Sequence, residues 1–419
     1  MRNTNIKHFY QIPRLEEILF GKNVELLSSV DELFELDLAY LEFITLNEEE
    51  LLERAAYFRS INQKLTRHFL MCNSNQKSHM IDRSNSTKIY FENGLFSTGY
   101  ATHGLFPYRG KFHPQLIKSL INIIGIRKNE NILDPMCGSG TTNIESSLMG
   151  INSYAIDLNP FCQFMTKVKY NSLFIDEKTL KGISDNANDI FNFFIEGNPF
   201  DKLKKIREEK KLRIYELSLL AFLDSLGYSK RVSSSTHQQL FVKVLKRYED
   251  TVDNFLKYSK EHIEYLGKVN ILSEATATQI PLDDNSIDGI ITSPPYSFAI
   301  DYVKNDEDQL RYLGYNVDDI RKNMIGLKGK NKDQRLTNYF NDMDIVCSKA
   351  ARVLKPGKYF VMIIGSNTNQ TGGIRLEQSI IDSCRNHGLS LVKSILKPIK
   401  GMRNTMKDEY ILFFQKGSS

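Results

Sequence analysis

The feature that most constrains the fold is an alternation of short apolar segments and helical segments that begins near residue 100. The strand candidates, in chain order, are residues 131–134, 153–157, 269–272, 287–291, 359–364 and 410–414. Strands that alternate with helices pair in parallel, because each helix carries the chain back to the start of the next strand. Residues 354–357, Leu-Lys-Pro-Gly, supply a turn before the fifth candidate. The sequence therefore predicts an α/β fold around a parallel sheet.

Four regions of different character divide the 419 residues. Residues 1–100 read as mainly helical, with a helix that starts after Asn47 and continues to about Leu65. Residues 101–172 carry the first part of the alternation and residues 269–419 the second. Residues 173–268, rich in Lys, Glu, Leu and Phe at helical spacing, read as a helical insertion and a candidate target-recognition region.

Composition excludes several classes of protein. No apolar run reaches the roughly 18 residues of a membrane span, and the polar start of the chain lacks a signal peptide's apolar stretch, so we expect a cytoplasmic protein without membrane contact. The five cysteines have no C-x-x-C spacing and read as free thiols in a reducing compartment. No His/Cys cluster suggests a metal. The net charge of +5 permits contact with a phosphate backbone without requiring it.

A glycine-containing turn, Asp-Pro-Met-Cys-Gly-Ser-Gly-Thr-Thr, follows the first strand candidate in residues 134–142. Glycines let the backbone pass close to a ligand, and the helix after the turn offers free N–H groups. Asn143 stands where the dinucleotide fingerprint has its third glycine, and no Gly-Lys-Ser/Thr follows, which excludes a phosphate loop. Taken alone, the turn is more readily a tight strand-to-helix connection. With the motifs below, it favours a nucleotide-like cofactor.

Acidic residues follow the next two strand candidates. Asp157 ends the first, where a carboxylate can accept hydrogen bonds from two ribose hydroxyls. Glu274 follows the second and can accept a hydrogen bond from an adenine amine. Asp157 could instead be a surface residue or cap the helix after Asn159-Pro160, and Glu274 on its own would be unremarkable.

The most informative stretch is Thr-Ser-Pro-Pro-Tyr in residues 292–296, directly after a strand candidate. Two prolines remove backbone donors and fix φ, so the turn is rigid and its carbonyl oxygens are free to accept hydrogen bonds. Ser293 adds a hydroxyl acceptor and Tyr296 an aromatic face. An aromatic amine is a poor nucleophile, and two aligned acceptors can hold its nitrogen in line with a methyl donor while a ring stacks on the base. The alternative is a purely structural turn that ends the strand, with the Tyr296 side chain in the hydrophobic core.

With these motifs, the chain resembles the DNA amino-methyltransferases, which modify cytosine N4 or adenine N6 and use S-adenosylmethionine. The resemblance covers residues 102–172 and 269–416 and implies a doubly wound, Rossmann-like methyltransferase sheet, with a helical N-terminal region and a helical insertion. The Ser-Pro-Pro-Tyr form is typical of the cytosine-N4 branch. Residues 351–357 are similar to the segment before the family's later strands. In the family's order the insertion follows the adenine-binding acid, whereas here it precedes Glu274.

The resemblance assigns roles residue by residue. Met136 stands where the family usually has Phe, and Glu274 where Asp is more common. The implied catalytic residues are Ser293, Pro294, Pro295 and Tyr296. The implied cofactor-binding residues are Lys111, Phe112, His113, Asp134, Pro135, Met136, Cys137, Gly138, Gly140, Thr141, Asp157 and Glu274, of which the first three belong to an element that closes over the methionine end.

The implied function is site-specific methylation of cytosine N4 in double-stranded DNA, within a restriction–modification system that has a separate endonuclease. The target base would be flipped into the pocket. Adenine-N6 methylation uses the same chemistry in a larger pocket. An RNA guanine-N2 methyltransferase usually begins its motif with Asp or Asn, which Ser293 does not match. A non-catalytic partner subunit would not need the intact motif.

Two segments are candidates for contact with DNA. Residues 230–239 mix cations with residues that read base edges, although they equally fit a loop that caps a helix. Residues 321–332 form a basic, glycine-containing stretch that could hold phosphates, although such a run is more often a solvated surface.

Overall fold

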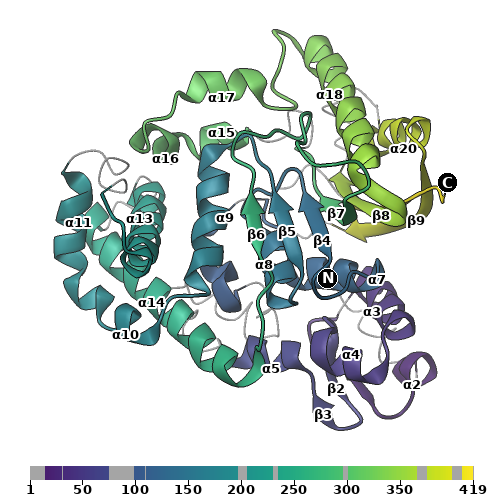
Figure 1. Ribbon diagram of the computed structural model, residues 1–419, viewed down its shortest axis with the longest axis horizontal. Coiled ribbons are helices and arrows are strands. Elements are labelled where there is room, and N and C mark those ends of the chain that lie inside the picture. The colour runs from purple at the N-terminus through teal and green to yellow at the C-terminus, as the bar shows by residue number, and fades with distance from the viewer. Residues whose placement is uncertain are drawn as a thin grey trace, which may run out of the picture. The chain divides into compact units, whose positions relative to one another are not determined.

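The computed structural model describes residues 15–30, 32–74, 99–108, 110–196, 205–229, 235–295, 301–365, 375–398 and 408–418 (Figure 1). The chain divides into two compact units, each built from two separate stretches of sequence. The first unit comprises residues 1–125 and 165–266, and the second comprises residues 126–164 and 267–419.

Among the described residues, a seven-stranded sheet forms the centre of the second unit. Its strands are β4 (Asn131–Asp134), β5 (Asn152–Ala155), β6 (Val269–Ile271), β7 (Ile287–Thr292), β8 (Leu354–Gly365), β9 (Leu389–Pro398) and β10 (Asp408–Lys416). They lie in the order β6-β5-β4-β7-β8-β10-β9, in which the first five are parallel and β10 is antiparallel to both neighbours. This confirms the predicted α/β fold, whose mostly parallel sheet is Rossmann-like.

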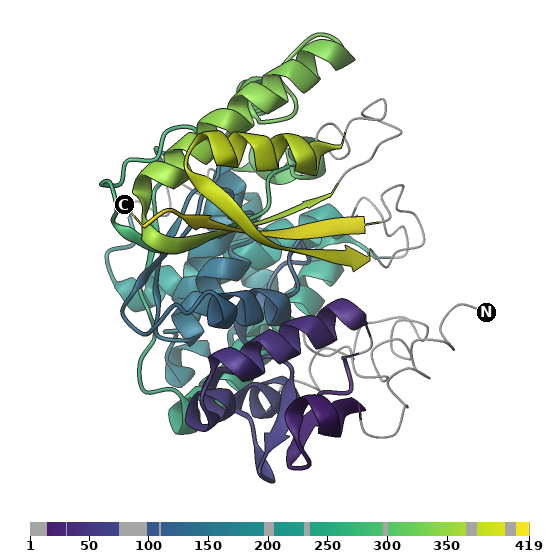
Figure 2. The ribbon, with the colours of Figure 1, turned by 90° about the vertical axis from the view of Figure 1, so that its right-hand side faces the viewer.

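Helices of the second unit lie beside this sheet and beyond the carboxyl ends of its parallel strands (Figure 1 and Figure 2). They are α8 (Thr141–Leu148), α15 (Tyr302–Asn305), α16 (Glu307–Tyr312), α17 (Val317–Asn323), α18 (Lys332–Val353) and α20 (Leu376–Asn386), together with the start of α9 (Pro160–Ser172). Every residue of β7 is buried, as expected of a central parallel strand. Apolar residues of β7, β8 and β10 share one core with the buried sides of α18 and α20, so the strand that leads into the Ser-Pro-Pro motif packs within a continuous apolar cluster.

Two sequence expectations for the second unit differ from the structure. Residues 354–357 lie inside β8 and do not form a separate turn: Leu354 pairs with Ile287, but Tyr359 pairs with Gly289, so part of β8 bulges out of register. Gly357 has a φ of +73° in this bulge. Strand β9 was not predicted, because it is an edge strand in which two partly exposed lysines, Lys393 and Lys397, interrupt the apolar pattern.

The N-terminal part of the first unit combines helices with a small sheet. Its elements are α2 (Leu15–Phe20), β1 (Val24–Leu26), α3 (Leu33–Thr45), α4 (Glu48–Arg54), β2 (Phe58–Ile61), β3 (Lys64–Leu65), α5 (Arg67–Ser74), η2 (Ala101–Gly104) and α7 (Pro114–Ile123). The predicted helix start at Asn47 is correct, since Asn47 and Glu50 form a capping box. The predicted extension to Leu65 is wrong, because α4 ends at Arg54 and the chain turns into β2, which pairs with β1 and β3.

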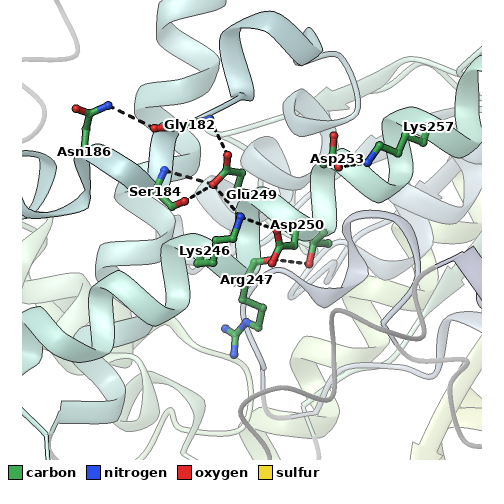
Figure 3. Close-up of polar contacts among 10 residues, drawn as sticks. Gly182, Ser184, Asn186, Lys246, Arg247, Glu249, Asp250, Asp253 and Lys257 are labelled. Carbon is green, nitrogen blue, oxygen red and sulfur yellow. Dashed lines mark hydrogen bonds and ion pairs between the residues drawn. The ribbon is translucent and has the colours of Figure 1, made fainter.

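The second stretch of the first unit is helical where it is described. Its elements are α10 (Glu177–Leu180), η3 (Ile183–Asn186), α11 (Ala187–Ile195), α13 (Glu209–Ser229) and α14 (His237–His262). Glu249 of α14 accepts hydrogen bonds from the Gly182 N–H (2.8 Å) and from the Ser184 side chain, which joins η3 to α14 (Figure 3). Lys246 lies 3.6 Å from the same carboxylate and 2.9 Å from Asp250. The contacts of Glu249 therefore stabilise the packing of η3 against α14.

Within the described part of the chain, no helix has both the length and the apolar character to cross a membrane. The same residues contain no group of three or more His, Cys, Asp or Glu side chains arranged to hold a metal ion. The five cysteines are buried free thiols.

Candidate active site

The motifs singled out in the sequence follow four adjacent strands. Strands β6, β5, β4 and β7 are neighbours and parallel, so their carboxyl ends lie at one edge of the sheet. The glycine turn follows β4, Asp157 follows β5, Glu274 follows β6 and Ser293 follows β7. Ligands of open α/β sheets bind at this edge. The strand order thus brings together segments that are far apart in the sequence.

The turn after β4 passes close to the end of β5, where two of its backbone N–H groups donate hydrogen bonds. Gly138 and Gly140 have φ values of +50° and +75°, and Gly140 caps α8. The Cys137 N–H donates to the Ile156 carbonyl (2.9 Å), and the Gly138 N–H donates to Oδ2 of Asp157 (2.8 Å). Residues with side chains rarely adopt this left-handed conformation, which explains the glycines.

Asp157 is a partly exposed carboxylate fixed by the backbone. Its second oxygen, Oδ1, accepts a hydrogen bond from the Asn159 N–H (2.8 Å). Burial raises the pKa of Asp157 to about 6, and these two N–H donors oppose the rise. Each carboxylate oxygen has acceptor capacity beyond one such hydrogen bond, so Asp157 can also accept from hydroxyl donors of a ligand.

Asp134 lies beneath this surface, with an exposed fraction of 1%. The Thr292 hydroxyl, at the end of β7, donates to its Oδ1 (2.8 Å), and the Met136 N–H donates to the same atom (3.2 Å). Burial raises the pKa of Asp134 to about 7, opposed first by the hydrogen bond from Thr292. Asp134 therefore connects the glycine turn to the residue directly before the Ser-Pro-Pro motif.

The sequence assigned no role to four residues of this edge, although Thr292 was recognised as the first residue of the motif in residues 292–296. Thr292 supplies the link to Asp134. Gln163 of α9 donates to the carbonyls of Asp157 (2.6 Å) and Ser273 (3.2 Å), and so joins the ends of β5 and β6. The Asn159 side chain donates to buried Asp306 (2.8 Å), which lies just before α16. Thr292 lies within a recognised motif, and Asn159 and Gln163 follow Asp157 by two and six residues, which was the available signal; Asp306 adjoins no recognised motif.

The remaining predicted site residues differ in their exposure to solvent. Glu274 is exposed, Ser293 and Pro295 are partly exposed, and Pro294 is buried. Tyr296 lies outside the described residues. In the glycine turn, Pro135, Cys137 and Thr141 are buried and Met136 is partly exposed.

Lys111, Phe112 and His113 belong to the first unit, where each is half-buried just before α7. The ammonium of Lys111 donates to the His103 carbonyl (2.6 Å). His113 is the N-cap residue of α7, and Pro114 occupies the first helical position.

The residues of the sheet edge fit a nucleoside cofactor on their own chemistry. The positive-φ glycines leave the turn backbone accessible at the start of a helix. Asp157, with acceptor capacity left, suits a ribose diol, and exposed Glu274 on the neighbouring strand suits an exocyclic amine. Among the described residues, no group of side chains suited to binding a metal ion lies with them.

Comparison with known proteins agrees with this geometry. Residues 105–223 match a family model described as the RMKL-like methyltransferase domain. The chain is 23% identical to the type II methyltransferase M.BsoBI of Geobacillus stearothermophilus over 308 residues, which cover 58% of this chain and 59% of that protein. It is 22% identical to the type II methyltransferase M.MvaI of Kocuria varians over 426 residues, covering 80% of this chain and 93% of that protein.

A shorter match is to an RNA-modifying enzyme. It is 37% identical over 54 residues to a tRNA (guanine(10)-N2)-dimethyltransferase of Methanothermobacter thermautotrophicus, covering 13% of this chain and 16% of that protein. The longer of these matches are to the type II methyltransferases, and together with the sheet edge they support a likeness to DNA methyltransferases that use S-adenosylmethionine as the methyl donor.

Proposed function

We propose that this protein transfers a methyl group from S-adenosylmethionine to the exocyclic N4 amine of cytosine in double-stranded DNA. The observation that carries the proposal is the hydrogen bond between Thr292 and Asp134 (2.8 Å). It joins the Ser-Pro-Pro turn after β7 to the glycine turn after β4. The turn proposed to orient the amine and the turn proposed to bind the nucleoside are thus both held by hydrogen bonds to Asp134.

The residues after Thr292 are assigned to the amine. The lone pair of an aromatic amine is delocalised into the ring, so the nitrogen attacks poorly unless it is held toward tetrahedral geometry. The Ser293 hydroxyl and the Pro294 carbonyl supply two acceptors for its N–H groups, and proline fixes the turn. Tyr296 would stack on the base.

The cofactor is assigned to the other strand ends. S-adenosylmethionine supplies an electrophilic methyl group on a sulfonium. Asp157 would accept hydrogen bonds from its ribose, and Glu274 would accept one from its adenine amine. The turn from Met136 to Thr141 would lie along it, and the segment of Lys111, Phe112 and His113 would close over its methionine end.

The proposed substrate is DNA because two relatives, matched over 308 and 426 residues, are type II methyltransferases. The exocyclic amine is out of reach inside a duplex, so the base would be flipped into the site. A type II methyltransferase implies a separate endonuclease that reads the same sequence, and we propose such a partner here.

A second candidate is methylation of an RNA guanine at N2, favoured by the match to the tRNA dimethyltransferase. Ser293, in place of the Asp or Asn usual in such enzymes, argues against it. Adenine N6 would use the same residues in a larger pocket.

The test is transfer of label from methyl-labelled S-adenosylmethionine to mixed-sequence duplex DNA and, in parallel, to bulk tRNA. The proposal predicts label in DNA and none above background in tRNA. Label in tRNA alone would replace DNA with RNA as the substrate, and label in neither would leave the proposed activity unsupported.

A further inference from the structure

We propose that Lys330 and Lys332, with Arg335, form a surface that binds the phosphate backbone of DNA. We call Lys328–Gly329–Lys330–Asn331–Lys332, together with Arg335, the basic loop. The inference rests on the proposed function and deepens it, because it names the part of the chain that would hold the substrate's backbone. Base edges are not involved, so the loop would contribute affinity and register but no sequence preference.

Hydrogen bonds hold the basic loop against the first turns of α18. The Arg335 side chain donates to the Gly329 carbonyl (3.1 Å), and the Asn338 side chain donates to the Lys328 carbonyl (3.0 Å). The Lys330 N–H donates to the Gln334 side chain (3.0 Å). The loop therefore presents its cations from a fixed backbone, which limits the conformational entropy lost on binding.

Gly329 is required for this fold. Its φ is +129°, and a Cβ placed there would lie 2.9 Å from the backbone nitrogen of Arg335. Only glycine allows the loop to approach the helix so closely. The conformation is thus specified by the sequence at the point where the cations gather.

The cations of the basic loop differ in whether a carboxylate is paired with them. Lys328 is paired with buried Asp342 (2.9 Å), and so serves the fold. Lys330 and Lys332 are exposed, and within the described chain no carboxylate lies within ion-pair distance of them or of Arg335. Asp333, exposed between them, is the one acid from residue 328 to 335. Neighbouring positive charges that lack anionic partners repel one another, and a bound polyanion would relieve that repulsion.

The position of the loop in the second unit suits this partner. The loop joins α17 to α18 at the top of Figure 1, beyond the carboxyl ends of the parallel strands. The Asn159–Asp306 hydrogen bond fixes the start of α16 to the same edge. Cations on this side would meet the backbone of a duplex whose target base enters the site at the strand ends.

The test compares two double variants with the same loss of charge. Lys330→Gln/Lys332→Gln changes the basic loop. Arg127→Gln/Lys128→Gln, at exposed positions before β4 and hence at the opposite edge of the sheet, is the control. Binding of a fluorescent mixed-sequence duplex is measured by anisotropy between about 50 and 200 mM salt. S-adenosylmethionine affinity and thermal unfolding of each variant verify its fold.

The loop variant is expected to bind DNA at about 0.1 M salt more than tenfold more weakly, with the slope of log K against log salt reduced by about 1.8, the value for two phosphate contacts. The control should keep the wild-type slope. Equal slopes for the two variants would overturn the inference even if the wild type methylates DNA. A wild type that neither binds nor methylates DNA would instead overturn the proposed function.

Discussion

Two carboxylates at the sheet edge, Asp134 and Asp157, differ in what surrounds them. Asp134 is buried and accepts hydrogen bonds from Thr292 and Met136, so it acts within the protein. Asp157 is partly exposed and fixed by two backbone N–H groups, so it can act on a ligand. The same residue type thus serves the fold in one place and the proposed cofactor in the other.

Replacing Ser293 by alanine tests the proposed orientation of the amine. The Ser293→Ala variant loses one acceptor but keeps the proline turn, so we expect kcat to fall by about 10²-fold while cofactor affinity stays near wild type. Single-turnover kinetics and calorimetry measure the two quantities. A variant that loses cofactor binding and transfer together would show that Ser293 supports the turn itself.

Protonation of Asp157 should weaken cofactor binding. Its pKa of about 6 lies above the usual value because of burial. As the pH falls from about 8 through 6, the carboxylate loses the charge that strengthens hydrogen bonds from ribose hydroxyls, and affinity should decrease. Calorimetry over this range is the measurement. Asp157→Asn should bind more weakly at pH 8 and lose most of the pH dependence, and an unchanged profile in that variant would contradict the ribose assignment.

At the scale of elements, the contact between the ends of β4 and β7 unites the two motifs. Thr292→Val keeps the shape of the side chain but removes the hydroxyl that donates to Asp134. Loss of a hydrogen bond to a buried carboxyl should cost about 1–3 kcal/mol of stability. Thermal unfolding measures the loss, and Thr292→Ser, which retains the hydroxyl, should remain close to wild type. Equal midpoints for the two variants would show that the bond contributes little.

Much of the sheet edge could be predicted from the sequence because its motifs are local. Strands β4, β5, β6 and β7 are short apolar segments, and the glycine turn, Asp157, Glu274 and Ser293 follow them directly. The contacts between motifs could not be predicted. Thr292 and Asp134 are 158 residues apart, and only the strand order brings β7 beside β4.

Other elements escaped prediction for different reasons. The small sheet of β1, β2 and β3 consists of strands of two to four residues, too short for a periodic pattern. Strand β9 is an edge strand whose apolar pattern is interrupted by two partly exposed lysines. Of the segment 230–239, the structure shows His237–Gln239 at the start of α14, capped by Thr236, while residues 230–234 lie outside the described part.

At the scale of the whole molecule, buried acids should make stability depend on pH. Burial raises the pKa of Asp306 to about 8 and that of Asp134 to about 7. The folded state therefore holds protons that the unfolded chain has released above about pH 4, so stability falls as pH rises from 4 to 8. Asp306→Asn should flatten this fall, seen as a smaller decrease in the unfolding midpoint between pH 5 and 8. An equal decrease in both proteins would contradict the assignment.

The central claim concerns the product, and the most direct measurement identifies it. DNA methylated by the purified protein with labelled S-adenosylmethionine is digested to nucleosides and analysed by mass spectrometry, with Ser293→Ala as the control of reduced activity. The account predicts that the label is recovered as N4-methylcytosine and that the control yields about 10²-fold less of it in the same time. Label recovered as N6-methyladenine would contradict the cytosine assignment, and DNA that carries no methylated amine would contradict the account as a whole.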